Sequence, residues 1–91
     1  MFIVVCYDIP DDRRRTRVGK TLEGFGYRVQ KSVFECEVDV DLYQRMRDQV
    51  GAVIDPQEDG VRYYSLCQSC LSKVVIAGLG EVQREKPFFA V

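Results

Sequence analysis

The sequence contains no histidine, and this absence narrows the chemistry that the chain can perform. Histidine is the usual general base near neutral pH and the commonest metal ligand, so its absence excludes a histidine-based catalytic site and a histidine-ligated metal centre. A metal-dependent hydrolysis would require the metal ion itself to generate the nucleophile. The chain also lacks a hydrophobic stretch near the roughly 18 residues of a membrane span, so we expect no membrane association.

The cysteines point to a reducing compartment. Residues 1–9 lack the basic start and the cleavage site of a signal peptide, so we expect a cytoplasmic protein whose Cys6, Cys36, Cys67 and Cys70 are thiols. Cys67 and Cys70 have the spacing of half a zinc site, but no second pair completes it. A redox pair is less favoured still, because we do not expect these residues to follow a strand and open a helix as in thioredoxin. We interpret them as buried thiols at a turn.

The charge is nearly balanced overall but is segregated along the chain. The net charge of -1 argues against a general nucleic-acid binder. Residues 11–31, however, hold seven basic and three acidic side chains, and residues 35–59 hold eight acidic and two basic ones. One face could therefore meet phosphates while another meets a basic protein partner.

An apolar, β-branched run over residues 3–9 predicts a buried central strand. Pro10 cannot donate a hydrogen bond to a sheet, so the strand should end there and leave the Asp8 carboxylate at the rim. One carboxylate is too few for a tight metal site, but Mg²⁺ is commonly bound by one or two carboxylates, and a two-fold axis could supply a second Asp8. The alternative is that Asp8 merely caps the strand.

The rest of the chain predicts two helices and further strands. The expected elements are, in order, a helix begun by Asp11 or Asp12 and ended by Gly24 and Gly26, a long strand over 27–38, a helix capped by Asp39 or Asp41 and ended at 55–56, a strand over 61–66, a turn or short helical turn over 67–72, and a strand over 74–77.

This order fits an α+β fold of the ferredoxin-like type, βαββαβ, with helices on one face of an antiparallel sheet. We expect one domain over residues 1–91, with a core over 1–78 and a tail over 79–91. The additional C-terminal strand is surplus to this sheet and is a candidate for packing on the sheet of a partner subunit. A chain of 91 residues buries only about two thirds of its unfolded surface, so we also expect a homodimer.

Four arginines gather near the start of the first predicted helix: Arg13, Arg14, Arg15 and Arg17. The planar guanidinium group suits bidentate contact with phosphate, although such a run is often only a solvated helix face. Two aromatic residues, Tyr7 and Phe34, could stack on bases or fill the core.

Several stretches together resemble the CRISPR-associated protein 2 family. These are Tyr7-Asp8-Ile9, the basic helix start, the run Arg28-Val-Gln-Lys-Ser-Val-Phe-Glu35, the triplet Arg62-Tyr63-Tyr64, and Leu66-Cys67-Gln-Ser-Cys70. The resemblance covers nearly the whole chain, and the run from Arg28 to Glu35 is its most specific part.

The resemblance implies a ferredoxin-like homodimer that acts in spacer acquisition. It implies an endonuclease dependent on Mg²⁺, with Mn²⁺ as the alternative, that acts on single-stranded RNA or double-stranded DNA. Asp8 corresponds to the metal-binding acid, one from each subunit, and Tyr7 joins it as a catalytic residue. Nucleic acid is expected at Arg13, Arg14, Arg15, Arg17, Arg28 and Phe34.

Two other functions stay open. The protein can be a non-catalytic dimeric scaffold that bridges dimers of the CRISPR-associated integrase and holds the incoming DNA through its phosphates, for which cleavage is not required. A remoter possibility is a regulatory domain of the same fold that binds a small effector without a metal.

Overall fold

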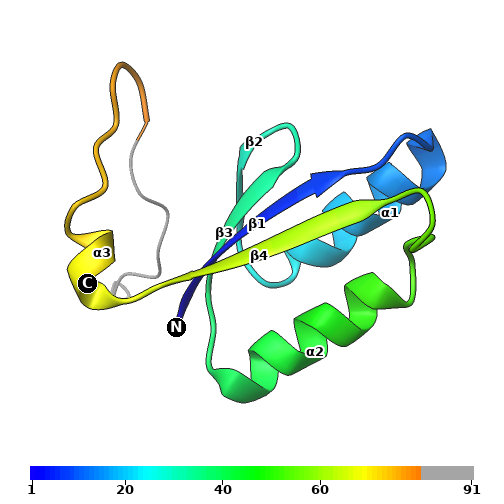
Figure 1. Ribbon diagram of the computed structural model, residues 1–91, viewed down its shortest axis with the longest axis horizontal. Coiled ribbons are helices and arrows are strands. Elements are labelled where there is room, and N and C mark those ends of the chain that lie inside the picture. Colours follow the sequence, from blue (N-terminus) through cyan, green and yellow to red (C-terminus); the bar gives the residue numbers. More distant parts are fainter. Residues whose placement is uncertain (81–91) are drawn as a thin grey trace.

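Four strands form one antiparallel sheet in the order β2-β3-β1-β4 in the computed structural model, which describes residues 1–80 (Figure 1). The elements are, in order, β1 (Phe2–Asp8), α1 (Asp12–Glu23), β2 (Tyr27–Gln30), β3 (Val33–Glu37), α2 (Val40–Gly51), β4 (Gly60–Leu66) and α3 (Gln68–Leu71). This is the predicted ferredoxin-like α+β arrangement. In the described part of the chain, no helix is long and apolar enough to span a membrane.

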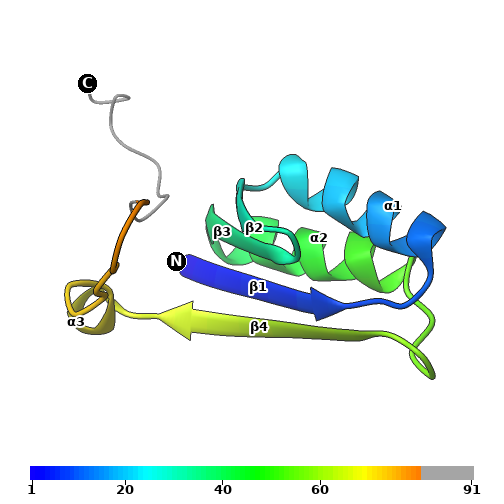
Figure 2. The same cartoon turned by 90° about the horizontal axis from the view of Figure 1, so that it is seen from above.

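Strand β1 lies inside the sheet, as its apolar run predicts. It pairs with β3 on one side and with β4 on the other, and both pairings are antiparallel. Helices α1 and α2 cover one face of the sheet and leave the other face open (Figure 2). The core on the helix side contains alternate residues of β1 together with apolar residues of both helices and of β3, namely Ile3, Val5, Tyr7, Val18, Leu22, Phe34, Cys36, Met46 and Val50.

Each main helix begins at an aspartate, as the sequence indicates. The Asp11 side chain accepts a hydrogen bond from the Arg14 amide at 2.9 Å, and the Asp39 side chain accepts one from the Leu42 amide at 2.8 Å. Both carboxylates satisfy amide groups that have no partner inside the helix. The predicted helix boundaries are therefore confirmed at their amino-terminal ends.

The prediction of one long strand over 27–38 is wrong. The segment turns back at residues 31 and 32, and β2 and β3 pair as a hairpin with an irregularity between Arg28 and Gln30. Gly26 enters this hairpin close to the backbone of β3. A side chain at position 26 would overlap the carbonyl oxygen of Glu35 and the Sγ atom of Cys36.

The prediction of a strand over 74–77 is also wrong for the described residues, because no strand follows β4 there. Within residues 1–80 this segment pairs with no strand, and its apolar side chains are exposed, with Val75 87% and Ile76 41% exposed. The expected packing of the tail on a partner's sheet stays a prediction, and residues 81–91 lie outside the described residues.

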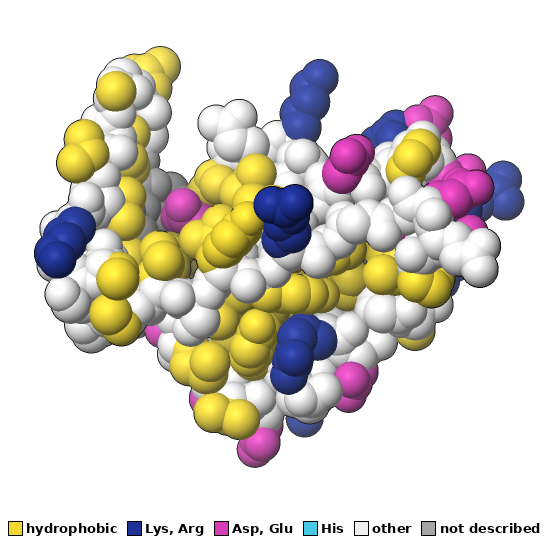
Figure 3. All heavy atoms as spheres, in the orientation of Figure 1, with side chains coloured by type: hydrophobic (Ala, Val, Ile, Leu, Met, Phe, Trp, Pro, Cys, Tyr) yellow, Lys and Arg dark blue, Asp and Glu magenta, His cyan; other side chains and the backbone are white. Residues whose placement is uncertain are grey.

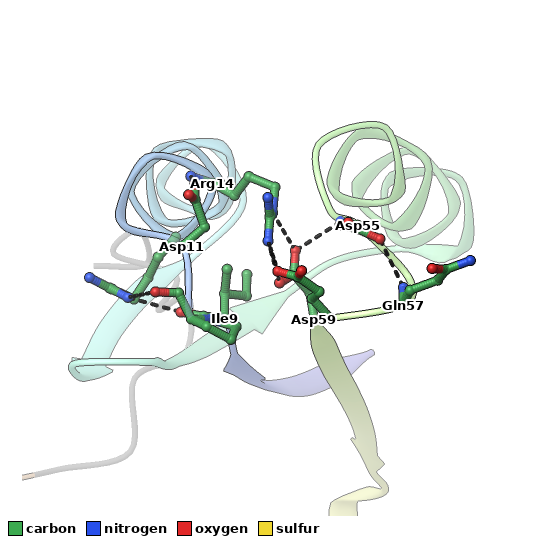
Figure 4. A network of polar contacts seen from close by, with 9 residues as sticks. Ile9, Asp11, Arg14, Asp55, Gln57 and Asp59 are labelled. Atoms are coloured by element: carbon green, nitrogen blue, oxygen red, sulfur yellow. Dashed lines mark hydrogen bonds and ion pairs between the residues drawn. The ribbon is translucent and has the colours of Figure 1, made fainter.

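A nearly buried ion pair fastens the start of α1 to the loop before β4 (Figure 4). Arg14 donates from Nε and Nη2 to the two carboxylate oxygens of Asp59, at 2.8 and 3.1 Å, and the Asp59 side chain is 0% exposed. Asp59 also accepts a hydrogen bond from the Asp55 amide at 2.8 Å. These bonds hold the pKa of Asp59 below its ordinary value of 3.8, with the Arg14 contact as the main cause.

The close approach at Gly26 gives a first prediction. Gly26→Ala should lower the free energy of unfolding by about 1–3 kcal/mol, because the atoms that its methyl group meets include backbone atoms that cannot move alone. Gly51→Ala is the matched control, since a methyl group there meets nothing within 4 Å and should stabilise the end of α2 by up to about 1 kcal/mol. Urea unfolding of both variants checks this, and equal effects would contradict it.

The ion pair gives a second prediction, for stability against pH. A carboxyl group whose pKa is lowered by folding stabilises the fold above its ordinary pKa, and this stabilisation is lost as the pH falls through the lowered value. Asp59→Asn should therefore destabilise the protein at neutral pH, and its difference from the unmodified protein should shrink as the pH falls below the ordinary carboxyl pKa of 3.8.

Urea unfolding across this pH range measures the effect. Glu58→Gln is the control, because Glu58 contacts the same arginine at 3.1 Å but is exposed, and it should change stability far less. A pH-independent difference between Asp59→Asn and the unmodified protein would contradict the assigned role of the carboxylate.

Candidate functional site

Asp8 lies where the prediction places it, at the end of β1 and at the rim of the sheet. Its side chain is exposed, and its register partner on β4 is Gly60. A side chain built at position 60 would meet nothing within 4 Å, so the space beside the carboxylate is open. Asp8 therefore can receive a ligand without any rearrangement of its own chain.

Two hollows of opposite charge meet at Asp8. The first has a volume of about 590 Å³, and in its lining Arg15, Lys20, Arg28 and Lys31 outnumber the acids Asp8 and Glu23. The second has a volume of about 540 Å³, and in its lining the acids Asp8, Glu58 and Asp59 outnumber Arg62. A polyanion that approached Asp8 would therefore be drawn to the basic hollow rather than to the other.

Tyr7 lines the basic hollow and holds one of its basic side chains in position. Its hydroxyl donates to the Lys31 carbonyl oxygen and accepts from Arg28 Nη1, both at 3.2 Å, and the residue is only 5% exposed. The Arg28 guanidinium also lies over the buried Phe34 ring, with Cζ 4.8 Å from the ring centroid. Tyr7 and Phe34 hold Arg28 in place, and Phe34 offers no free face for stacking on a base in this protomer.

Gly19 makes this arrangement possible. A side chain at position 19 of α1 would lie 2.5 Å from Arg28 Nη2 and 3.3 Å from the Tyr7 hydroxyl. The absence of a side chain there lets the guanidinium and the phenol approach the helix closely. The sequence gives no signal for this role, because a glycine in the middle of a helical pattern usually only weakens the helix.

The predicted arginines fall into three groups. Arg15 lines the basic hollow and also donates to the Ile9 carbonyl oxygen at 2.9 Å, so it fixes the loop that follows β1. Arg14 is occupied by Asp59, as described above. Arg13 and Arg17 are exposed and make no ion pair or hydrogen bond with any of residues 1–80, so both are available to a phosphate.

Two lysines of the hollow were not among the predicted site residues. Lys20 lies on α1 near its carboxyl end, and Lys31 lies in the turn between β2 and β3. The prediction of a single strand over 27–38 missed the hairpin turn. This turn brings Lys31 beside the end of β1. The predicted catalytic role of Tyr7 and the predicted nucleic-acid contacts stay predictions.

The donor set restricts how a metal ion can bind. Among residues 1–80, no group of three or more acidic, cysteine or histidine side chains could hold a metal ion together. The exposed Asp8 carboxylate alone suits a hydrated Mg²⁺ ion that also binds a substrate phosphate and a second carboxylate from another subunit. The residues therefore fit a shared magnesium site rather than a closed site within one chain.

The open face of the sheet is partly apolar. The residues of β1 and β4 that alternate with the buried ones include Val4, Cys6, Tyr64 and Leu66, and Tyr64 is 45% exposed. Figure 3 shows hydrophobic side chains gathered over the strands on this face. Asp8 lies on the same face, at the end of β1, so a second molecule that covers this face would also lie close to the Asp8 carboxylate.

Comparisons with known proteins agree with this geometry. The chain is 46% identical over 80 residues to the CRISPR-associated endoribonuclease Cas2 3 of Chloroflexus aurantiacus, which is 88% of this chain and 86% of the relative. A hypothetical protein of Thermus thermophilus superposes with a TM-score of 0.80 at 35% identity, covering 90% of this chain and 95% of that one.

A chain of a partial Cas6–RT–Cas1–Cas2 complex superposes with a TM-score of 0.73 at 25% identity, covering 82% of this chain and 88% of that one. The family described as CRISPR associated protein Cas2 matches residues 1–74. This chain therefore belongs to the CRISPR-associated protein Cas2 family.

Proposed function

We propose that this protein is a metal-dependent endonuclease of CRISPR spacer acquisition that hydrolyses phosphodiester bonds of single-stranded RNA or double-stranded DNA in the cytoplasm. The single observation that carries the proposal is the exposed Asp8 carboxylate at the rim of the sheet beside a basic hollow of about 590 Å³. A nuclease needs an acid for the metal and cations for the phosphates. Both lie side by side here, and the relative from Chloroflexus aurantiacus is named an endoribonuclease.

The active form is a homodimer. One chain supplies one Asp8 and leaves an apolar sheet face open beside it, so a second copy against this face would bury apolar surface and bring a second Asp8. When bound between two Asp8 carboxylates, Mg²⁺ or Mn²⁺ would lower the pKa of a water ligand and polarise the phosphoryl oxygen.

The chain's own residues bind and orient the nucleic acid. Lys20 and Lys31 would contact phosphates that flank the scissile one, and Arg28 would present its guanidinium from a fixed position above Phe34. Arg15 would keep the loop after Asp8 in place through its bond to the Ile9 carbonyl oxygen. None of these contacts reads a base, so cleavage should depend little on sequence.

The alternative function is a scaffold without catalysis. A chain of similar fold occurs in a Cas1–Cas2 complex, so this protein would bridge integrase dimers and track DNA by its phosphates. The free Arg13 and Arg17 suit this function as well as they suit nuclease activity. The two functions differ in whether Asp8 is needed.

Removal of the carboxylate tests the nuclease. Asp8→Asn keeps the shape of the side chain but removes its charge, so metal-dependent cleavage of labelled RNA and duplex DNA should fall by at least about 100-fold. EDTA should abolish cleavage by the unmodified protein. Asp48→Asn is the control, because Asp48 is an exposed acid on α2, behind the sheet, and its loss should leave the rate unchanged.

Cleavage that survives in Asp8→Asn would contradict the proposal. Sedimentation at the assay concentration tests the dimer, since an active monomer would rule out a site shared between two Asp8 carboxylates. Spacer acquisition that persists in Asp8→Asn, but is lost when Arg13 and Arg17 are both changed to glutamate, would favour the scaffold.

The salt dependence of DNA binding tests the phosphate contacts. Arg17→Gln should reduce the slope of log K against log salt concentration by about 0.9, because one phosphate contact releases about that many counterions on duplex DNA. Arg45→Gln should leave the slope unchanged, since Arg45 is also exposed but lies on α2, which supplies no residue to the basic hollow, whereas α1, the helix of Arg17, supplies Arg15 and Lys20. Fluorescence anisotropy at several salt concentrations measures both slopes, and equal slopes for the two variants would overturn the assignment of Arg17.

A further inference from the structure

Cys67 and Cys70 do not form the buried turn that the sequence suggests. Both residues are exposed, whereas Cys36 is buried and Cys6 is partly buried. Strand β4 ends at Leu66, Cys67 is the cap residue of α3, and Cys70 lies within this short helix. The pair does follow a strand and open a helix, contrary to the prediction.

Cys67 and Cys70 are joined by a hydrogen bond, and their thiols are not equivalent. Cys67 Sγ accepts a hydrogen bond from the Cys70 amide at 3.5 Å, and this bond is the main cause that lowers the pKa of the Cys67 thiol. The neighbouring Cys67 side chain raises the pKa of the Cys70 thiol. Cys67 is therefore the nucleophile of the pair, and Cys70 keeps its proton nearby.

We infer that Cys67 and Cys70 are a reversible dithiol pair that exchanges with small disulfides of the glutathione type. The Cys67 thiolate attacks one sulfur of glutathione disulfide, and the first glutathione leaves as a thiolate that takes up a proton. Cys70 then gives up its proton and attacks Cys67 Sγ, which releases the second glutathione. The protein loses two electrons, and one glutathione disulfide becomes two glutathione molecules.

The local fold can accommodate the resulting bond. Side chains three residues apart on a helix have Cβ atoms about 5–6 Å apart, and a disulfide needs about 3.5–4.5 Å, so the turn must tighten by roughly 1–2 Å. The exposed surface of α3 leaves room for this movement. The buried Leu71 anchors the helix on its other side, so the tightening need not disturb the main core.

The same observations disfavour a closed zinc site. Within residues 1–80 no third acidic, cysteine or histidine side chain joins Cys67 and Cys70, so one protomer offers only two of the four ligands that structural zinc requires. Two thiols that bind no metal ion stay free to react with small disulfides.

Oxidation would act on the chain that follows α3. The amides of Lys73 and Val74 donate to the carbonyl oxygens of Cys70 and Leu71, at 3.1 and 3.2 Å, so the turn sets the direction of the exposed apolar segment after it. A bond from Cys67 to Cys70 would fix this turn to the end of β4. The inference is independent of any activity at Asp8.

Thiol counting on the folded full-length chain tests the pair. The reduced protein is incubated with excess glutathione disulfide, alkylated under denaturing conditions and weighed intact. Two of its four thiols should no longer be alkylated, and no glutathione should remain attached. Peptide mapping should then find a disulfide between Cys67 and Cys70. Cys70→Ser should instead retain one glutathione on Cys67, and Cys67→Ser should react much more slowly. Cys6→Ser is the control and should still lose two thiols.

Three results would overturn the inference. The first is four thiols that stay free in the presence of excess disulfide. The second is a disulfide between two chains, visible as a dimer on a non-reducing gel. The third is tightly bound zinc that protects both thiols from alkylation, which would assign the pair to a metal site shared between subunits.

Discussion

The ion pair between Arg14 and Asp59 is the contact on which the geometry of the site depends. It joins the beginning of α1 to the residue that precedes β4, and Gly60, the first residue of β4, lies opposite Asp8. The ion pair therefore holds together the two loops beside the end of β1, namely the loop from β1 to α1 and the loop from α2 to β4. Because the Asp59 side chain has no exposed surface, loss of Arg14 would leave the charge of this carboxylate buried without its main partner, which costs more than the pair itself gains.

The charges around Asp8 are compatible with both proposed functions. Basic side chains line one side of the carboxylate and acidic ones approach the other, so a nucleic-acid backbone is drawn to a single side. Binding of DNA by a scaffold needs only this asymmetry. The proposed hydrolysis needs the same asymmetry together with a metal ion, and residues 1–80 of one chain offer no cluster of ligands around Asp8 to hold it. Under the proposed mechanism, binding would need one chain, whereas cleavage would need two.

The sequence predicted the elements whose signals are local. The apolar run before Pro10 and the capping residues Asp11 and Asp39 identified β1 and the starts of both helices. It did not predict what depends on distant contacts. Nothing local marks Arg14 as the partner of Asp59, 45 residues away, and so an arginine that serves stability was grouped with those expected to bind phosphate.

The errors over residues 27–38 and 67–70 have one cause. The turn at Lys31 and Ser32 contains no glycine, proline, asparagine or aspartate, so no strong turn residue revealed that the strand reverses. The four-residue helix after Cys67 is too short to show any periodicity, and the exposure of its thiols is decided by where β4 ends. In both segments the path of the backbone decides where the functional side chains lie.

Gly60 controls how closely another molecule can approach Asp8. A Cβ atom at this position would meet nothing within 4 Å, so a side chain there would project beside the carboxylate and reduce the access of any molecule laid across the sheet. Under the proposed nuclease mechanism, such a substitution would lower cleavage without removing the acid itself. A protein that keeps only the proposed scaffold function would then differ from a nuclease at this single position.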